Sequence, residues 1–379
     1  MDDAVEPFTV EPFAVDVPEE AVADLRRRLR GTRWPETATV GDWSQGVPLP
    51  WLQEVCRYWA EEHDWSRVQA ELNAFPQVTT VVDGLPVHLL HVRSPHAGAL
   101  PLVLTHGWPG SVVEFLGLLG PLTDPEDPRD AFSVVVPSLP GYGWSGKPAA
   151  PGWGPARTAD AWAEVMRRLG YERFGAQGGD IGSFVSANLG ARHPDRVVGV
   201  HLNMVVTGPP EEQTEFDGRE QRALDRLREF RTDGSAYSHQ HRTRPQTLGY
   251  GLTDSPAGQA AWILEKFAAW TDGDPVAAIG LDRLLDDVSV YWFTATATSS
   301  ARMYWEMARA PQEREPRVDV PTGVSLFPHE IFQPPRAWVE RQLTDLRTWR
   351  EHDGGGHFAA LERPAELVAD VREFFRPLR

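Results

Sequence analysis

The sequence predicts an α/β fold in which a mostly parallel sheet is flanked by helices and interrupted by an inserted helical segment. Two short apolar runs, at residues 102–106 and 132–137, are continuous rather than alternating, which is typical of strands buried on both faces. Strand and helix patterns then alternate along the chain, and this alternation favours parallel strands covered by helices. Between about residue 205 and residue 315 the pattern becomes helical and charged, so we expect a separate lobe there.

Two helices and a strand pair are expected before residue 96. Amphipathic patterns predict the helices at residues 18–29 and 49–63. Valine-rich stretches flank Asp83 and Gly84, a dipeptide that strongly favours the two-residue turn of a hairpin. We expect this N-terminal region to meander along the core and to wrap it.

The alternation that follows predicts the first part of the core. Thr158 is expected to cap a helix that carries one apolar stripe, and Gly170 is expected to end that helix. Short apolar runs at residues 174–177 and 197–202 predict two more buried strands. Strand–helix units of this kind build a parallel sheet.

Strand patterns return after the helical lobe, at residues 322–327 and 345–350. The chain then ends in a helix whose apolar residues share one face. A parallel sheet interrupted by a helical lobe is a familiar design for enzymes that need a lid. The predicted organisation is an N-terminal region at residues 1–95, the first part of the core at 96–204, a helical cap at 205–315 and the second part of the core at 316–379.

Composition excludes several classes of partner. The 379 residues include 37 Lys and Arg against 54 Asp and Glu, a net charge of −17, which argues against nucleic acid and anionic membranes as partners. Cys56 is the single cysteine, so no internal disulfide and no CxxC metal or redox site can form. The first 17 residues are acidic and have no long apolar run, so neither a signal peptide nor a membrane anchor is expected. We expect a cytoplasmic protein.

The segment GGDIG at residues 178–182 lies between a predicted strand and a predicted helix. Its spacing is that of the nucleophile elbow, G-x-S-x-G, in which a tight turn lifts one side chain off the sheet edge. Glycines are needed at both ends because the turn leaves no room for Cβ atoms. The central residue is Asp180, and a carboxylate attacks saturated carbon and leaves an alkyl ester, whereas serine attacks acyl carbon. The competing interpretation is that Asp180 only caps the following helix.

Two further residues favour the catalytic interpretation. Glu330 directly follows the predicted strand at 322–327, and His357 follows the last predicted strand after three glycines. The chain order of nucleophile, acid and base is the order of the α/β-hydrolase fold. We therefore predict that Asp180 is the nucleophile, that His357 is the base, and that Glu330 orients it.

The loop HGWPG at residues 106–110 comes directly after another predicted strand. In this fold, that loop and the residue after the nucleophile each donate a backbone N–H to an oxyanion. The predicted donors are Trp108 and Ile181. His106 is expected to be structural, because its imidazole would brace the loop.

Taken together, these motifs resemble those of the epoxide hydrolases of the α/β-hydrolase fold, in their microsomal-like branch. The resemblance covers nearly the whole chain, from PFTVEPFAVDV and HGWPGS through GGDIGS to RPQTLGYGLTDSPAG, SSARMYWE, VPTGVSLFPHEI and GGHFAALERP. Microsomal members carry an N-terminal membrane-spanning segment. Because this sequence begins directly with the N-terminal epoxide-hydrolase region, a bacterial-type member without that anchor is expected.

The resemblance implies that two cap tyrosines hydrogen-bond the epoxide oxygen. By motif these are Tyr304 in SSARMYWE and Tyr237 in SAYSHQHRTRP, while Tyr250 and Tyr291 compete with Tyr237 for the second position. A phenol is a neutral donor at pH 7 that can stabilise an emerging alkoxide.

The predicted reaction has two steps. Asp180 opens the epoxide, and water activated by His357 then hydrolyses the hydroxyalkyl ester to release a vicinal diol. A haloalkane-type dehalogenase is the alternative, because it uses the same Asp–His chemistry with a halide cradle in place of the phenols. Abundant aromatic residues, for example Trp108, Trp292 and Phe293, favour a small-molecule substrate that is an apolar or aryl epoxide. Self-association into a homo-oligomer is left open.

Neither a cofactor nor a metal is expected. The segment GYGWSG at residues 141–146 fits a dinucleotide-binding pattern, but prolines follow where that motif requires a helix. His239 and His241 lack a third ligand at a sensible spacing, so both are expected to be solvated histidines of the cap. The charged run at residues 224–231 is expected to be a solvated helix face.

Overall fold

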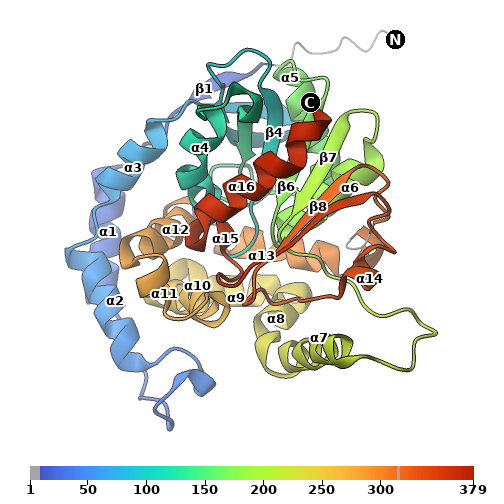
Figure 1. The fold of residues 1–379 in the computed structure, drawn as a ribbon. Helices are drawn as coiled ribbons and strands as arrows, with labels where there is room; N and C mark the ends of the chain where they lie inside the picture. Colours follow the sequence, from blue (N-terminus) through green and yellow to red (C-terminus); the bar gives the residue numbers. More distant parts are fainter. Residues whose placement is uncertain (1–8, 314–315) are drawn as a thin grey trace.

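The computed structural model describes residues 9–313 and 316–379 (Figure 1). Residues 1–8, which begin the acidic segment considered for a signal peptide or anchor, lie outside the described residues. So do residues 314–315, at the predicted end of the cap. In the described part of the chain, no helix combines the length and apolar character needed to cross a membrane.

One sheet of nine strands, counted over the described residues, forms the centre of the molecule in the order β1-β2-β3-β5-β4-β6-β7-β8-β9. From β5 to β9 the neighbours pair in parallel, whereas β1, β2 and β3 form an antiparallel extension. The predicted mostly parallel sheet is therefore confirmed. The strands are β1 (Glu11–Phe13), β2 (Gln77–Val82), β3 (Leu85–Val92), β4 (Leu100–Thr105), β5 (Phe132–Pro137), β6 (Phe174–Gly178), β7 (Val197–Leu202), β8 (Thr322–Leu326) and β9 (Leu346–Glu351).

The turn between β2 and β3 follows from its two residues. Asp83 and Gly84 both have positive φ, 49° and 75°, and join two antiparallel strands in register. Turns with two positive φ angles match the twist of hairpin strands, which explains the preference for Asp-Gly. The predicted hairpin is confirmed.

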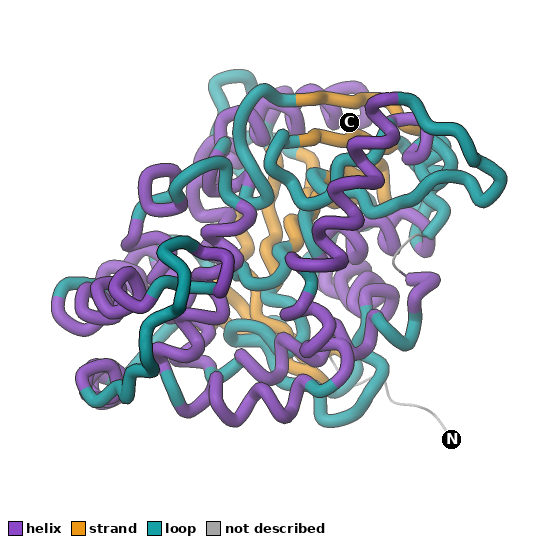
Figure 2. The backbone as a smooth tube through the Cα atoms, turned by 90° about the horizontal axis from the view of Figure 1, so that it is seen from below, coloured by secondary structure: helices purple, strands orange, loops and turns teal. Residues whose placement is uncertain are grey.

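Helices cover both faces of the sheet because alternate strand residues point to opposite sides. Leu102 and Leu104 of β4 belong to the apolar cluster formed with α4 (Leu116–Thr123) and α16 (Pro364–Phe375). Val103 belongs to the other cluster, with α5 (Pro155–Arg168) and α6 (Ile181–Arg192). Figure 2 shows the strands enclosed by these and other helices.

The predicted start of α5 is wrong. The helix begins at Pro155 after Gly154, and Thr158 lies inside its first turn, where its hydroxyl donates to the Gly154 carbonyl at 2.9 Å. Proline suits the first position of a helix because its missing N–H has no partner there in any case. The Pro155 signal therefore outweighs the capping preference of Thr158.

The N-terminal helices α1 (Glu19–Arg30), α2 (Leu49–Glu61) and α3 (Trp65–Asn73) lie along one side of the molecule, and they are blue in Figure 1. The first two were predicted, whereas α3 and the short β1 were not. These helices brace the inserted helices: the Trp59 indole N–H donates to the Ser289 hydroxyl at 2.9 Å, and His63 bonds Asp286 at 2.9 Å.

The inserted helices lie over the end of the sheet where β4, β6 and β8 finish (Figure 1). They are α7 (Gly218–Glu229), α8 (Ala236–Thr243), α9 (Pro245–Asp254), α10 (Pro256–Trp270), α11 (Pro275–Ala278), α12 (Leu281–Thr294) and α13 (Ala297–Met307). The chain then returns through β8, the short α14 (Arg336–Val339), β9 and α15 (Ala359–Glu362). Parallel α/β sheets place functional groups at this end, because the loops after successive strands converge there.

Candidate active site

Asp180 occupies the tight turn between β6 and α6. Its φ of 49° and ψ of −128° are unusual for a residue with a side chain, and such backbone strain is concentrated at functional sites. A Cβ on Gly178 would collide with the Gly182 carbonyl, and one on Gly182 would collide with the Thr105 carbonyl. The carboxylate makes no capping bond to the helix that follows. The turn therefore has the geometry of an elbow, and the competing capping interpretation finds no support.

The carboxylate of Asp180 faces the loop after β4. The Trp108 N–H donates to its Oδ1 at 2.8 Å, and Gly107 permits this approach because any Cβ there would overlap the carboxylate. Burial raises the pKa of Asp180 above its ordinary value, while His357 and the N–H groups of Trp108 and Ile181 favour the charged form. The two predicted oxyanion donors are thus already directed at this carboxyl group.

His357 lies between two carboxylates. Its Nδ1 is 2.8 Å from Glu330 Oε1, and its Nε2 is 3.7 Å from Asp180 Oδ2. Glu330 Oε1 also accepts the N–H of Ile331 at 2.6 Å, and the side chain of Glu330 is fully buried. Burial opposes a charge on the imidazole, but the adjacent Glu330 outweighs it and the pKa of His357 is raised to about 9. The structure therefore brings Asp180, His357 and Glu330 together: one imidazole nitrogen hydrogen-bonds Glu330, and the other lies within ion-pair distance of Asp180.

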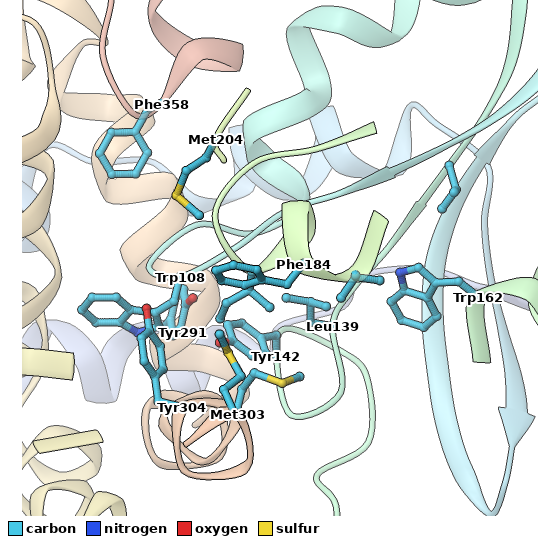
Figure 3. Packing of buried hydrophobic residues seen from close by; sticks show 14 of the residues in the cluster. Trp108, Leu139, Tyr142, Trp162, Phe184, Met204, Tyr291, Met303, Tyr304 and Phe358 are labelled. Atoms are coloured by element: carbon cyan, nitrogen blue, oxygen red, sulfur yellow. The ribbon is translucent and has the colours of Figure 1, made fainter. Parts of the chain in front are cut away.

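Two tyrosines enter from the cap. Tyr237 on α8 and Tyr304 on α13 have ring centroids 5.8 Å apart, and Trp108 stacks on Tyr237 at 4.9 Å with an interplanar angle of 11°. Figure 3 shows Tyr304 beside Trp108. Burial raises the pKa of both phenols, so both are neutral donors at physiological pH. Among the described residues, the Tyr304 hydroxyl finds no hydrogen-bond partner of standard geometry.

The two competing tyrosines are placed differently. Tyr250 is 73% exposed, and the Tyr291 hydroxyl donates to the Gly110 carbonyl at 2.8 Å. By contrast, Tyr237 and Tyr304 line the same cavity as Asp180. Of the four candidates, therefore, only Tyr237 and Tyr304 share a cavity with the nucleophile.

That cavity has a volume of about 920 Å³, and its walls combine apolar with polar and charged side chains. Trp292 and Phe293, which suggested an aromatic pocket, do not line it: Phe293 packs against Trp65 at 4.7 Å, and Trp292 lies under Arg28. These two aromatic residues therefore do not shape the cavity, because they face the N-terminal helices. The apolar lining consists of Ile181, Phe184, Met204, Val206, Pro209, Leu227, Phe230, Met307, Ala308, Ile331 and Phe332.

A second, much smaller cavity lies behind the nucleophile. Its volume is about 20 Å³, and its walls include Asp180, His357, Glu114 and Asn203. A space of roughly 10–15 Å³ admits one water molecule when polar groups surround it. This cavity is therefore large enough for a single water beside the carboxyl group of Asp180.

Comparison with known proteins agrees with this geometry. The family model described as the epoxide hydrolase N terminus matches residues 10–115, and the alpha/beta hydrolase fold model matches residues 101–244. A Stigmatella aurantiaca protein provisionally named an epoxide hydrolase is 52% identical, over 98% of this chain and 86% of its own length. The chain belongs to the epoxide hydrolase family. It also has the α/β-hydrolase fold.

Solved structures of epoxide hydrolases resemble the whole chain. The Aspergillus niger epoxide hydrolase has a TM-score of 0.90 at 36% identity, covering 98% of this chain and 97% of that one. The juvenile hormone epoxide hydrolase of the silkworm Bombyx mori has a TM-score of 0.91 at 30% identity, covering 98% and 95%. The agreement over nearly the full length includes the cap and the N-terminal region as well as the core.

Two buried acids near the HGWPG loop were not identified from the sequence. Asp287 accepts the Ser111 hydroxyl at 2.5 Å, and burial raises its pKa to about 8. Glu114 lines the small cavity, and burial together with Asp287 raises its pKa well above the ordinary value. The available signal was an acid within an apolar run, as in SVVEF and RLLDDVSV. Acids that enter apolar surroundings tend to stay protonated, so they can support the loop without adding charge.

The histidines outside the triad have structural surroundings. His106 contacts the Gly107 carbonyl and accepts the Leu139 N–H, so it braces the loop as predicted. His241 is fully buried, contrary to the expectation of a solvated residue. It accepts the Trp262 indole N–H at 3.0 Å, and burial lowers its pKa to about 3. In residues 9–313 and 316–379, no cluster of three or more His, Cys, Asp or Glu side chains could hold a metal ion.

Proposed function

We propose that this protein converts an epoxide and water to a vicinal diol through a covalent ester on Asp180. The observation that carries the proposal is one cavity with a carboxylate on a strained elbow at one side and two neutral phenols at the other. The carboxylate supplies a nucleophile for carbon, and the phenols supply donors for the oxygen that leaves it. Residues 205–315 then act as a cap that brings the phenols to the core.

In the first step, a carboxylate oxygen of Asp180 attacks one ring carbon. The carbon–oxygen bond of the epoxide breaks, and the oxygen receives a hydrogen bond or a proton from Tyr304 and Tyr237. Their raised pKa keeps both protonated before the reaction. A donor already in place stabilises charge as it develops on the oxygen, without reorganising solvent.

In the second step, water hydrolyses the ester. Once Asp180 is esterified, its negative charge is gone, and this charge helps to keep the pKa of His357 high. The pKa of His357 therefore falls in the ester, and the imidazole becomes a base. Water in the small cavity gives one proton to His357 and attacks the carboxyl carbon, and the Trp108 and Ile181 N–H groups hold the oxyanion. The tetrahedral intermediate then breaks its bond to the diol oxygen, which takes the proton back from His357. The second proton of the water replaces the one that the phenols gave up, and Asp180 returns to the carboxylate. Glu330 stabilises the imidazolium that forms.

The proposed substrate is an epoxide with a substantial apolar part, because aliphatic and aromatic side chains form a large share of the cavity walls. We also propose that the enzyme works in the cytoplasm, where a chain with one cysteine needs no disulfide. A haloalkane dehalogenase remains the rival activity. A panel of epoxides and haloalkanes separates the two by diol and halide release, and we expect diol from epoxides and no halide.

The covalent route is tested by a single turnover in heavy-oxygen water with enzyme in excess. The oxygen that opens the ring comes from Asp180, so the first diol should be unlabelled and the label should appear in the peptide that contains Asp180. Repeated turnover should then carry the label into the product. A labelled first diol with an unlabelled peptide would show that water attacks the epoxide directly, and would overturn the roles proposed for Asp180, Trp108 and Ile181.

A further inference from the structure

The outer part of the large cavity has the opposite charge balance to the rest of the chain. Its lining includes the exposed residues Arg231, Arg242, Arg317 and Arg341, with Glu211 as the acid among them. The whole chain carries 54 acidic residues against 37 basic ones, so an average surface would show the reverse. The side chains at this mouth therefore form a local positive region on an acidic protein.

Most of these cations are not neutralised by a carboxylate. Arg317 pairs with Asp319 at 2.9 Å. Arg242 contacts His239 at 2.9 Å, and Arg341 approaches the Gly208 carbonyl at 3.4 Å. Neither partner is a carboxylate, so neither contact compensates the positive charge. Within residues 9–313 and 316–379, Arg231, Arg242 and Arg341 form no ion pair. A guanidinium carries five N–H donors in a fork that fits a carboxylate, so donors remain available at the mouth.

These arginines lie on segments that approach from different parts of the chain. Arg231 follows α7 and Arg242 ends α8, both in the cap, whereas Arg317 and Arg341 flank β8 and α14 of the core. The same cavity is lined by apolar side chains of the cap, Phe230 and Leu227, and of the core, Ile331 and Phe332. A ligand that reaches from the nucleophile to the mouth can therefore pack an apolar segment against them.

The size of the cavity also favours a long ligand. Cavities that bury a drug-sized molecule measure roughly 300–1,000 Å³, and this one lies near the upper end, at about 920 Å³. An epoxide with only a few carbons would leave most of that volume to water. A longer substrate would fill the apolar wall and place its far end among the arginines.

We propose that the mouth is a subsite for an anionic group, and that the substrate is an epoxide whose apolar chain ends in a carboxylate. This inference rests on the proposed epoxide hydrolysis, because the ring must lie between Asp180 and the two phenols while the carboxylate lies at the mouth. The arginines then select the substrate without taking part in either chemical step. Their contribution should appear mainly in KM, since binding that is equal in the ground and transition states leaves kcat unchanged.

The test uses two substrates of nearly equal size, one anionic and one neutral: the terminal epoxide of undecenoic acid and its methyl ester. The full-length enzyme should hydrolyse both, with kcat/KM for the acid roughly fivefold or more above that for the ester at low salt. Raising the ionic strength should reduce this preference, because exposed charges are screened over about 10 Å at 0.1 M salt.

Variants test whether the arginines at the mouth cause the preference for the acid over the ester. The double variant Arg231→Gln/Arg341→Gln should reduce the acid-to-ester ratio toward one, through a higher KM for the acid. The matched control Arg93→Gln/Arg173→Gln removes two positive charges from exposed arginines that do not line the cavity, and it should keep the wild-type ratio.

The outcomes separate this inference from the proposed function. Diol from both substrates without a preference for the acid would overturn the anionic subsite and leave epoxide hydrolysis standing. An equal loss of preference in the control pair would also overturn it, because net charge alone would then explain the effect. Absence of diol from both substrates and from the wider epoxide panel would instead overturn the proposed function.

Discussion

The two sides of the cavity hold their reactive groups in different ways. On the core side, backbone and side-chain hydrogen bonds fix the groups: Trp108 donates to Asp180, and Ile331 and His357 both contact Glu330. On the cap side, Tyr237 and Tyr304 are placed by ring packing around Trp108. The core side is thus held by directional bonds, and the cap side by contacts between aromatic surfaces.

This difference matches what each side must do. The core groups act in both steps, so their geometry must survive the conversion of a carboxylate to an ester and back. The phenols act on an oxygen that arrives with the substrate, and a hydroxyl already bonded to protein would have to give up that bond first. The Tyr304 hydroxyl forms no hydrogen bond of standard geometry with the described residues, which suits its proposed role.

The largest effect is expected from removing the nucleophile. Asp180→Ala should reduce diol formation to background, because no other group on the core side can form the ester. The fold should stay near native, since the side chain projects from the elbow into the site. Steady-state diol assays and circular dichroism check this pair of expectations. Wild-type turnover by this variant would show that the core side does not supply the nucleophile.

Removing the base should separate the two steps. His357→Gln should still be alkylated, because Asp180 needs no base, but hydrolysis of the ester should slow by roughly 10²–10⁴-fold. Intact-mass spectrometry after one turnover should show the protein heavier by one substrate. Continued turnover without any trapped adduct would mean that this scheme assigns His357 to the wrong step.

A smaller effect is expected on the cap side. Tyr304→Phe should slow alkylation by about 10–100-fold, which corresponds to roughly 1.5–3 kcal/mol for a donor to a charged oxygen. Tyr237→Phe should act similarly, and the double variant should lose far more because no donor remains. Tyr250→Phe is the matched control, since that residue is 73% exposed and should be silent. A silent Tyr237→Phe with a crippled Tyr291→Phe would reassign the second donor.

The smallest effect is expected from a change of pH, and the two steps should respond to it differently. The rate of each step should change by at most about tenfold per pH unit. Hydrolysis needs neutral His357, so its rate should rise with pH until the imidazole is deprotonated. That midpoint should lie below the resting value of about 9, because esterification removes the negative charge of Asp180. Alkylation needs ionised Asp180 and should fall in acid, at a pH above the ordinary carboxyl range because burial raises that pKa. Single-turnover kinetics across the pH range measure the rates of alkylation and of hydrolysis separately. The same pH profile for both rates would contradict the scheme.

Local sequence rules predicted the core side well. Gly178 is required by a steric contact inside the elbow, with the Gly182 carbonyl, whereas Gly182 is required by the Thr105 carbonyl of β4. The start of α5 was predicted wrongly, although the Pro155 signal that sets it is local. Glu330 follows the buried strand β8 and His357 follows the partly exposed edge strand β9, and both strands were predicted, so the placement of these residues at one sheet edge could be predicted. Tyr237 could be named only through resemblance to a family, because no local pattern distinguishes it from Tyr250.

By itself, the sequence determined the parallel sheet, the strained elbow with Asp180, the order of nucleophile, acid and base, and the hairpin at Asp83. Only the tertiary structure decided which faces of the cap helices look toward the nucleophile. His241 became buried beside Tyr304, while Trp292 and Phe293 turned toward α1 and α3. The physical reason is that the cap helices are apolar on more than one side, since they pack against the core, the N-terminal helices and each other. Helical periodicity then leaves their rotation undetermined, and the sum of those contacts fixes it.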